Sequence, residues 1–101
     1  MSRLEDLRRL AQAEPNDPLA HYALALEHLN LEQWDAAVTA FDKTLEIDAN
    51  YTAAYYHKAR AEIRAGRRDA AKATLDSGMR CARASGDMKT EREMRELWET
   101  T

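Results

Sequence analysis

Apolar residues recur at every third or fourth position over most of this chain, which is the spacing of one face of an α-helix. Near the start, this spacing predicts a helix that ends before Pro15 and whose apolar residues are Leu4, Leu7, Leu10 and Ala11. Ser2 and Glu5 form a capping-box pattern, in which each side chain can bond the backbone N–H of the other residue. No stretch of the chain indicates a strand.

The same periodicity predicts five further helices, separated by residues that favour helix ends. Asp17 suits an N-cap, Asn50 can cap a later helix, and Gly66 supplies the left-handed residue that follows a helix. We expect the helices over residues 18–31, 34–48, 51–65, 68–84 and 88–99. The gaps between them are short, so neighbouring helices should pack antiparallel.

One segment of the chain recurs about 34 residues later. Residues 34–41 align with residues 68–75, and both copies contain the triplet Asp-Ala-Ala. A large apolar residue, Phe41 or Leu75, follows the second alanine of the triplet by four positions. This spacing places a small and a large residue on the same helical face, as close packing between helices requires.

Composition supports an all-α fold and excludes several classes of protein. The 101 residues suffice for one domain, 45% are hydrophobic, 33% are charged, and only three are glycine. The net charge of −3 disfavours a general nucleic-acid binder. Neither a membrane-spanning run nor a signal peptide is recognisable, so we expect a cytoplasmic location. Cys81, the only cysteine, is interpreted as a partly buried apolar residue.

Charge is unevenly distributed between the two halves of the chain. Residues 1–50 carry a net charge of −6, and residues 51–101 carry +3. Such a chain can stack head to tail, can attract an acidic partner to its second half, or can simply have a salt-bridged helical surface. Lys58 and Glu62 lie four positions apart on one predicted helix and are expected to pair.

The repeated register over residues 18–85 resembles the tetratricopeptide repeat family. In the first copy, the positions that the family fills with characteristic packing residues hold His21, Leu24, Ala25, His28, Trp34, Asp35, Ala37, Phe41 and Thr44. In the second copy, they hold Tyr55, Lys58, Ala59, Glu62, Arg68, Asp69, Ala71, Leu75 and Gly78. The resemblance implies an α-solenoid of antiparallel helix pairs in a right-handed superhelix of about six helices. It divides the chain into a half repeat (2–15), two repeats (18–51 and 52–85) and a C-terminal capping helix (87–99). We expect such a module to belong to a longer array.

The resemblance also implies a concave face, lined by the first helix of each repeat, that binds a peptide or a partner protein. The positions that would face this groove are Leu19, Tyr22, Leu26, Leu29, Asn30, Ala53, Tyr56, Arg60, Ile63 and Arg64. The two arginines lie on one helical face and suit recognition of a carboxylate. Alternatively, these arginines form a solvated surface and the tyrosines belong to the core.

Catalysis, cofactors and metals find no support in the sequence. His21 and His28 lie two helical turns apart, but neither clustered carboxylates nor a second thiol completes a metal-ligand set. We therefore expect a non-enzymatic scaffold without a cofactor or metal. Two alternatives are self-association through the apolar side of the N-terminal half repeat and, more remotely, contact with nucleic-acid phosphates through the basic second half.

Overall fold

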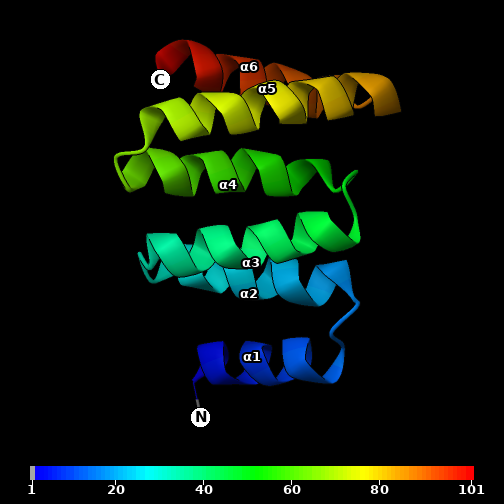
Figure 1. Ribbon diagram of the computed structural model, residues 1–101, viewed down its shortest axis with the longest axis vertical. Helices are drawn as coiled ribbons and strands as arrows, with labels where there is room; N and C mark the ends of the chain where they lie inside the picture. Colours follow the sequence, from blue (N-terminus) through cyan, green and yellow to red (C-terminus); the bar gives the residue numbers. More distant parts are fainter. Residues whose placement is uncertain (1) are drawn as a thin grey trace.

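The computed structural model describes residues 2–101 and shows six α-helices stacked one after another along the longest axis of the molecule (Figure 1). The stack measures 39 × 28 × 18 Å. The described residues contain no strand, so the all-α expectation is confirmed. The helices are α1 (Arg3–Ala13), α2 (Pro18–Asn30), α3 (Trp34–Ile47), α4 (Thr52–Arg64), α5 (Arg68–Ser85) and α6 (Met88–Thr100).

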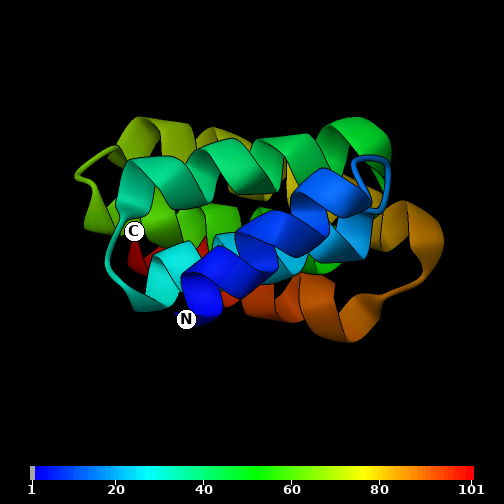
Figure 2. The same cartoon turned by 90° about the horizontal axis from the view of Figure 1, so that it is seen from below.

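Adjacent helices pack as antiparallel hairpins, and the hairpins form two layers. α2 contacts α4, and α4 contacts α6, so these three helices lie along one side of the stack. α3 packs against α2 and α4, and α5 packs against α4 and α6, which places α3 and α5 together on the opposite side. The view along the stack shows the two layers, with α3 and α5 in the upper row (Figure 2). Each helix within residues 2–101 is too short or too polar to cross a lipid bilayer.

Most helix ends fall within a residue or two of the positions predicted from the sequence. The Ser2 hydroxyl accepts the Glu5 N–H at 3.1 Å, and the Asp17 carboxylate accepts the Leu19 N–H at 3.0 Å, as N-caps should. The prediction that Asn50 caps α4 is wrong. Tyr51 occupies the N-cap position without a side-chain cap bond, because the turn is closed by Asp48, whose carboxylate accepts the Asn50 N–H at 3.0 Å.

Small residues let the helices approach closely, and large residues fill the space between them. Ala37 and Ala71, one in each copy of the repeated segment, are fully buried, as are Ala25 and Ala59 on the facing helices. Next to these alanines, the largest fully buried side chains of the core are Phe41, Leu75, Met94 and Thr44. The hairpins are therefore held by close alanine contacts around a few bulky residues.

The expected ion pair between Lys58 and Glu62 does not form. The Lys58 Nζ lies 2.7 Å from Asp42 Oδ1 on α3. The buried Glu62 carboxylate instead accepts a hydrogen bond of 2.6 Å from the Thr74 hydroxyl on α5. The face of α4 that carries both residues packs between α3 and α5, so each side chain finds its partner on a neighbouring helix.

α6 is fixed to α5 by a buried carboxylate. Glu91 accepts hydrogen bonds from Arg83 on α5, at 3.1 Å, and from Arg95 one turn further along α6. The Arg83 hydrogen bond is the main reason that the pKa of Glu91 lies below its ordinary value, with Arg95 adding to the effect. α6 begins 36 residues after α4, whereas α4 begins 34 residues after α2. The first turn of α6 thus begins two residues later than the 34-residue period predicts.

Gly78 permits the closest approach in the core, and its replacement should reveal the cost of losing that approach. A Cβ atom at this position would lie 2.5 Å from the Met94 sulfur and 2.6 Å from the Tyr55 Cβ. We expect Gly78→Ala to lower the free energy of unfolding by about 1–3 kcal/mol, because overpacking outweighs the higher helix propensity of alanine. Urea denaturation measures this change.

The exposed Ala73 on the same helix provides the control for helix propensity. Ala73→Gly should cost about 1 kcal/mol, the ordinary difference between these residues in a helix. A Gly78→Ala protein that is more stable than the parent would show that helix propensity dominates at position 78 and would contradict the packing argument.

Candidate functional site

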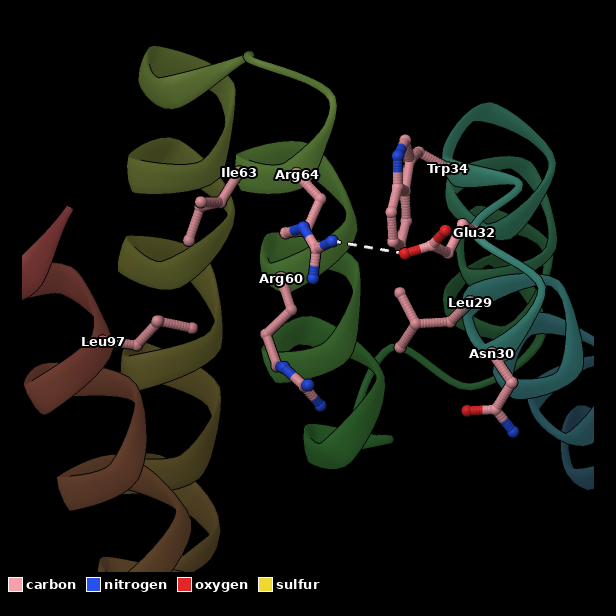
Figure 3. Close-up of a pocket in the computed structure, with 8 residues that line it drawn as sticks. All are labelled: Leu29, Asn30, Glu32, Trp34, Arg60, Ile63, Arg64 and Leu97. Carbon is pink, nitrogen blue, oxygen red and sulfur yellow. Dashed lines mark hydrogen bonds and ion pairs between the residues drawn. The ribbon is translucent and has the colours of Figure 1, made fainter.

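A pocket of about 440 Å³ opens on the layer formed by α2, α4 and α6, at the end of the layer where α2 and α4 terminate. Three half-buried apolar side chains, one from each helix, line it: Leu29, Ile63 and Leu97. The other lining residues are Asn30, Glu32, Trp34, Arg60 and Arg64. Figure 3 shows Ile63 and Leu97 pointing into the same space between α4 and α6, with Arg60 and Arg64 on the side of α2. We call this space the groove pocket.

Two arginines on α4 supply the positive charge of the groove pocket. The guanidinium carbon of Arg64 lies 4.7 Å from the ring centroid of Trp34, and its Nη2 lies 3.4 Å from the Glu32 carboxylate (Figure 3). The stacking and the ion pair together restrict the orientation of this guanidinium. Arg60 is exposed, and its Nη1 lies 3.3 Å from Nδ1 of His57. Hence both arginines can offer N–H donors to a ligand in the pocket.

Glu32, which pairs with Arg64, lies in a turn and has a backbone conformation that is unusual for a residue other than glycine. Its φ of 59° lies in the left-handed region, where glycine is the preferred residue. The equivalent turn after α4 has a glycine at this position, Gly66, with φ 81°. Both turns close with the same pair of backbone hydrogen bonds, including Gln33 N–H to His28 C=O in the first turn and Arg67 N–H to Glu62 C=O in the second. A strained residue therefore lines the pocket where the other repeat has an unstrained one.

Of the predicted groove residues, about half surround the groove pocket. Leu29, Asn30, Arg60, Ile63 and Arg64 line it together. Tyr56 lies in an adjoining hollow of about 290 Å³, which shares Leu97 with the groove pocket. The remaining predicted residues lie elsewhere.

Tyr22 and Leu26 are half-buried and pack against the core between α2 and α4. The Tyr22 ring centroid lies 4.8 Å from that of Tyr51 and 6.0 Å from that of Phe41. Burial, and secondarily Tyr51, raises the pKa of Tyr22. Leu19 is 59% exposed at the start of α2 and lines neither the pocket nor the hollow, and Ala53 is half-buried. These four positions lie outside the region where the charged and apolar groups converge.

Three residues that line the groove pocket were not predicted from the sequence: Glu32, Trp34 and Leu97. Leu97 belongs to α6, which the sequence identifies as a capping helix rather than as a third helix of the groove. Glu32 and Trp34 lie in and just after a turn, outside the first helices. Position 32 corresponds to Gly66 in the next repeat, and this glycine was the available sign that position 32 has a left-handed backbone.

The three histidines have separate environments. His28 is buried, with Nδ1 2.8 Å from the Gln33 side-chain oxygen, and His21 places Nε2 3.0 Å from the Pro15 carbonyl oxygen. His57 lies among aromatic rings, and burial, reinforced by Arg60, lowers its pKa, while Glu93 acts in the opposite direction. Among residues 2–101, no three histidine, cysteine or acidic side chains are grouped so that they could hold a metal ion.

Helix hairpins stacked in two layers, with a pocket on one of them, are typical of the α-helical repeat proteins. The family model of the tetratricopeptide repeat matches residues 28–90, more than half of the sequence. The chain therefore belongs to the tetratricopeptide repeat family, whose domains generally mediate binding between proteins. No curated protein matches it.

Solved structures share the fold. A tetratricopeptide repeat domain protein from Salinibacter ruber is 34% identical, with a TM-score of 0.78 over 85% of this chain and 87% of that one. The TPR2B domain of yeast Sti1, solved as a complex with pHsp70, is 23% identical, with a TM-score of 0.90 over 95% of this chain and 77% of that one. PcrH, solved in complex with the chaperone binding region of PopD, is 16% identical, with a TM-score of 0.90 over 96% and 74% of the two chains. The sequence identities of these last two structures are below 25%, so the similarity shows only that the fold is shared.

The substitution Glu32→Gly should stabilise the protein. The left-handed backbone costs a residue with a side chain about 1 kcal/mol or more, whereas the exposed ion pair with Arg64 contributes less than that. We expect Glu32→Gly to raise the free energy of unfolding by about 1 kcal/mol in urea denaturation. Glu32→Ala is the control, because it removes the same carboxylate and keeps the backbone strain. Equal stability of the two variants would refute the strain argument.

The lowered pKa of His57 predicts a loss of stability in mild acid. In the unfolded chain, this imidazole takes up a proton near its ordinary pKa of 6.5, but in the folded protein it does so only at lower pH. The unfolded state therefore binds more protons as the pH falls below 6.5, and the folded state loses stability until the pH passes the folded pKa. We expect His57→Phe to flatten the dependence of the unfolding free energy between pH 7.5 and 5.

Urea denaturation at several pH values measures this dependence in both proteins. Parallel pH profiles for the parent and the variant would mean that His57 has the same proton affinity in the folded and unfolded chains. That result would contradict the proposed environment of the ring.

Proposed function

We propose that this chain is a non-enzymatic scaffold module that binds an extended segment of a partner protein in the groove pocket, as part of a larger protein or complex. The observation that carries this proposal is the convergence of three apolar side chains from three helices with two arginines from one of them. An apolar floor with a few polar groups at its edge is the usual character of a binding site.

The chemistry of the pocket favours a ligand with a carboxylate. Arg60 and Arg64 lie one helical turn apart, so their guanidinium groups can approach the same acidic group or two neighbouring ones. Leu29, Ile63 and Leu97 can accept an apolar side chain beside that carboxylate. Asn30 adds an amide that can bond a peptide backbone.

The comparisons support a protein ligand in general terms. Two of the similar folds were solved with partner proteins, pHsp70 for the Sti1 domain and a region of PopD for PcrH. In the same proposal, residues 18–51 and 52–85 are two repeats, residues 2–15 are a half repeat, and residues 87–99 are the terminal helix.

Trp34 can report occupation of the pocket, because its ring forms one wall. In a Trp98→Phe background, the fluorescence of Trp34 is followed while a blocked hexapeptide, Gly-Leu-Glu-Leu-Leu-Gly, is titrated. Trp98 is the only other tryptophan and lies outside the pocket, so its removal leaves a single reporter. We expect saturable binding that weakens about fivefold in Arg60→Ala and about as much in Leu29→Ala.

Arg68→Ala is the matched control, because this exposed arginine begins α5 and lies outside the pocket. It should leave the affinity unchanged. If no acidic, basic or mixed hexapeptide of this kind changes the Trp34 signal, or if the pocket variants and the control behave alike, the proposed function is wrong.

A second candidate function, self-association through the N-terminal end, has its own observation. Leu10 on α1 and Leu19 on α2 are 46% and 59% exposed, so both present apolar surface to water at this end of the stack. Sedimentation velocity at the protein concentration of the titration separates this candidate from peptide binding, because only self-association depends on protein concentration without peptide.

A further inference from the structure

Two glutamates of α6 lie close to α4, in the same layer of helices as the groove pocket. Glu93 and Glu96 line the hollow next to the groove pocket, together with Tyr56, Leu97 and Thr100. Both glutamates are exposed, and Leu97 belongs to the wall of both spaces. The pocket and the hollow therefore adjoin at Leu97, and we call the two together the trough.

The charges in this trough are separated by sign. Arg60 and Arg64 lie toward α2, and Glu93 and Glu96 lie on α6. Among residues 2–101, neither glutamate forms an ion pair with either arginine, and the one ion pair in the trough joins Arg64 to Glu32. The imidazole of His57 senses both groups, since Arg60 lowers its pKa and Glu93 raises it. One end of the trough thus attracts negative charge, and the other end attracts positive charge.

We propose that the segment bound in this trough is bipolar, with an acidic residue facing Arg60 and Arg64, a basic residue facing Glu93 and Glu96, and apolar residues between them. This inference rests on the proposed function and adds to it the requirement for a basic residue. Charge complementarity at the rim of a binding site mainly determines which partner is accepted, so an entirely acidic segment is disfavoured by repulsion at α6.

The dimensions of the layer fix the spacing between the two charges of the ligand. Packed helices lie about 8–10 Å apart, and an extended chain advances about 3.3 Å per residue. A segment that crosses from α4 to α6 therefore carries its acidic and basic residues about three positions apart. The two residues between them lie over the apolar wall formed by Ile63 and Leu97.

Four blocked hexapeptides of one length test the proposal in the same Trp34 assay: Gly-Glu-Leu-Leu-Lys-Gly, its reverse order Gly-Lys-Leu-Leu-Glu-Gly, and the like-charged Gly-Glu-Leu-Leu-Glu-Gly and Gly-Lys-Leu-Leu-Lys-Gly. At least one bipolar peptide should bind about fivefold more tightly than both like-charged peptides at low salt. The double variant Glu93→Gln, Glu96→Gln should bind the doubly acidic peptide as tightly as the better bipolar peptide, because only the repulsion at α6 separated them. Glu93→Lys, Glu96→Lys should prefer the doubly acidic peptide.

Glu99→Gln is the control, because this exposed glutamate of α6 lies outside the trough. It should preserve the preference of the parent. Circular dichroism verifies that α6 remains folded in each variant.

The outcomes distinguish this inference from the proposed function. If the doubly acidic peptide binds the parent as tightly as the better bipolar peptide, the bipolar ligand is refuted while the groove pocket remains a binding site. The same conclusion follows if the glutamine double variant still prefers the bipolar peptide over the doubly acidic one. If none of the four peptides changes the Trp34 signal, the proposed function fails, and this inference fails with it.

Discussion

Close approach between helices is the constraint on which the rest of this structure depends. Fully buried alanines at positions 25, 37, 59 and 71, and the glycine at 78, leave room for Phe41, Leu75 and Met94 between the hairpins. Because protein interiors are packed as densely as organic crystals, a change of volume at one of these positions must be accommodated by the neighbouring helices. The separation of α4 and α6, and therefore the width of the trough, depends on core residues such as Gly78 and Met94, which do not line it.

Two features of the residues that line the trough are unfavourable for stability, unlike the close packing of the core. Glu32 adopts a left-handed backbone without being a glycine, and Arg60 and Arg64 carry two positive charges along one helical face. Each of these choices is unfavourable for stability by itself. Both lie at the same pocket, and strained or repulsive features of this kind often lie at functional surfaces.

The sequence predicts the helices and their pairing well, because both depend on local signals. The recurrence of Asp-Ala-Ala, the caps at Ser2 and Asp17, and the burial of Ala37 and Ala71 all agree with the structure. Features that depend on neighbouring helices were harder to predict. Glu62 bonds Thr74 instead of Lys58, and the side chains of α6 enter the trough, because tertiary contacts select among side chains that local spacing treats as equivalent.

The apolar residues of the groove pocket keep the period of the repeat. Leu29, Ile63 and Leu97 follow one another at intervals of 34 residues, so α6 continues the register of α2 and α4 although it begins two residues late. The charged residues do not keep this period, because Arg60 stands where α2 has Leu26 and α6 has Met94. A protein built by averaging the hairpins into one identical unit would keep the apolar positions but would have the same charge at every step. In the natural chain the charges change from one helix to the next, so the two ends of the layer are chemically distinct.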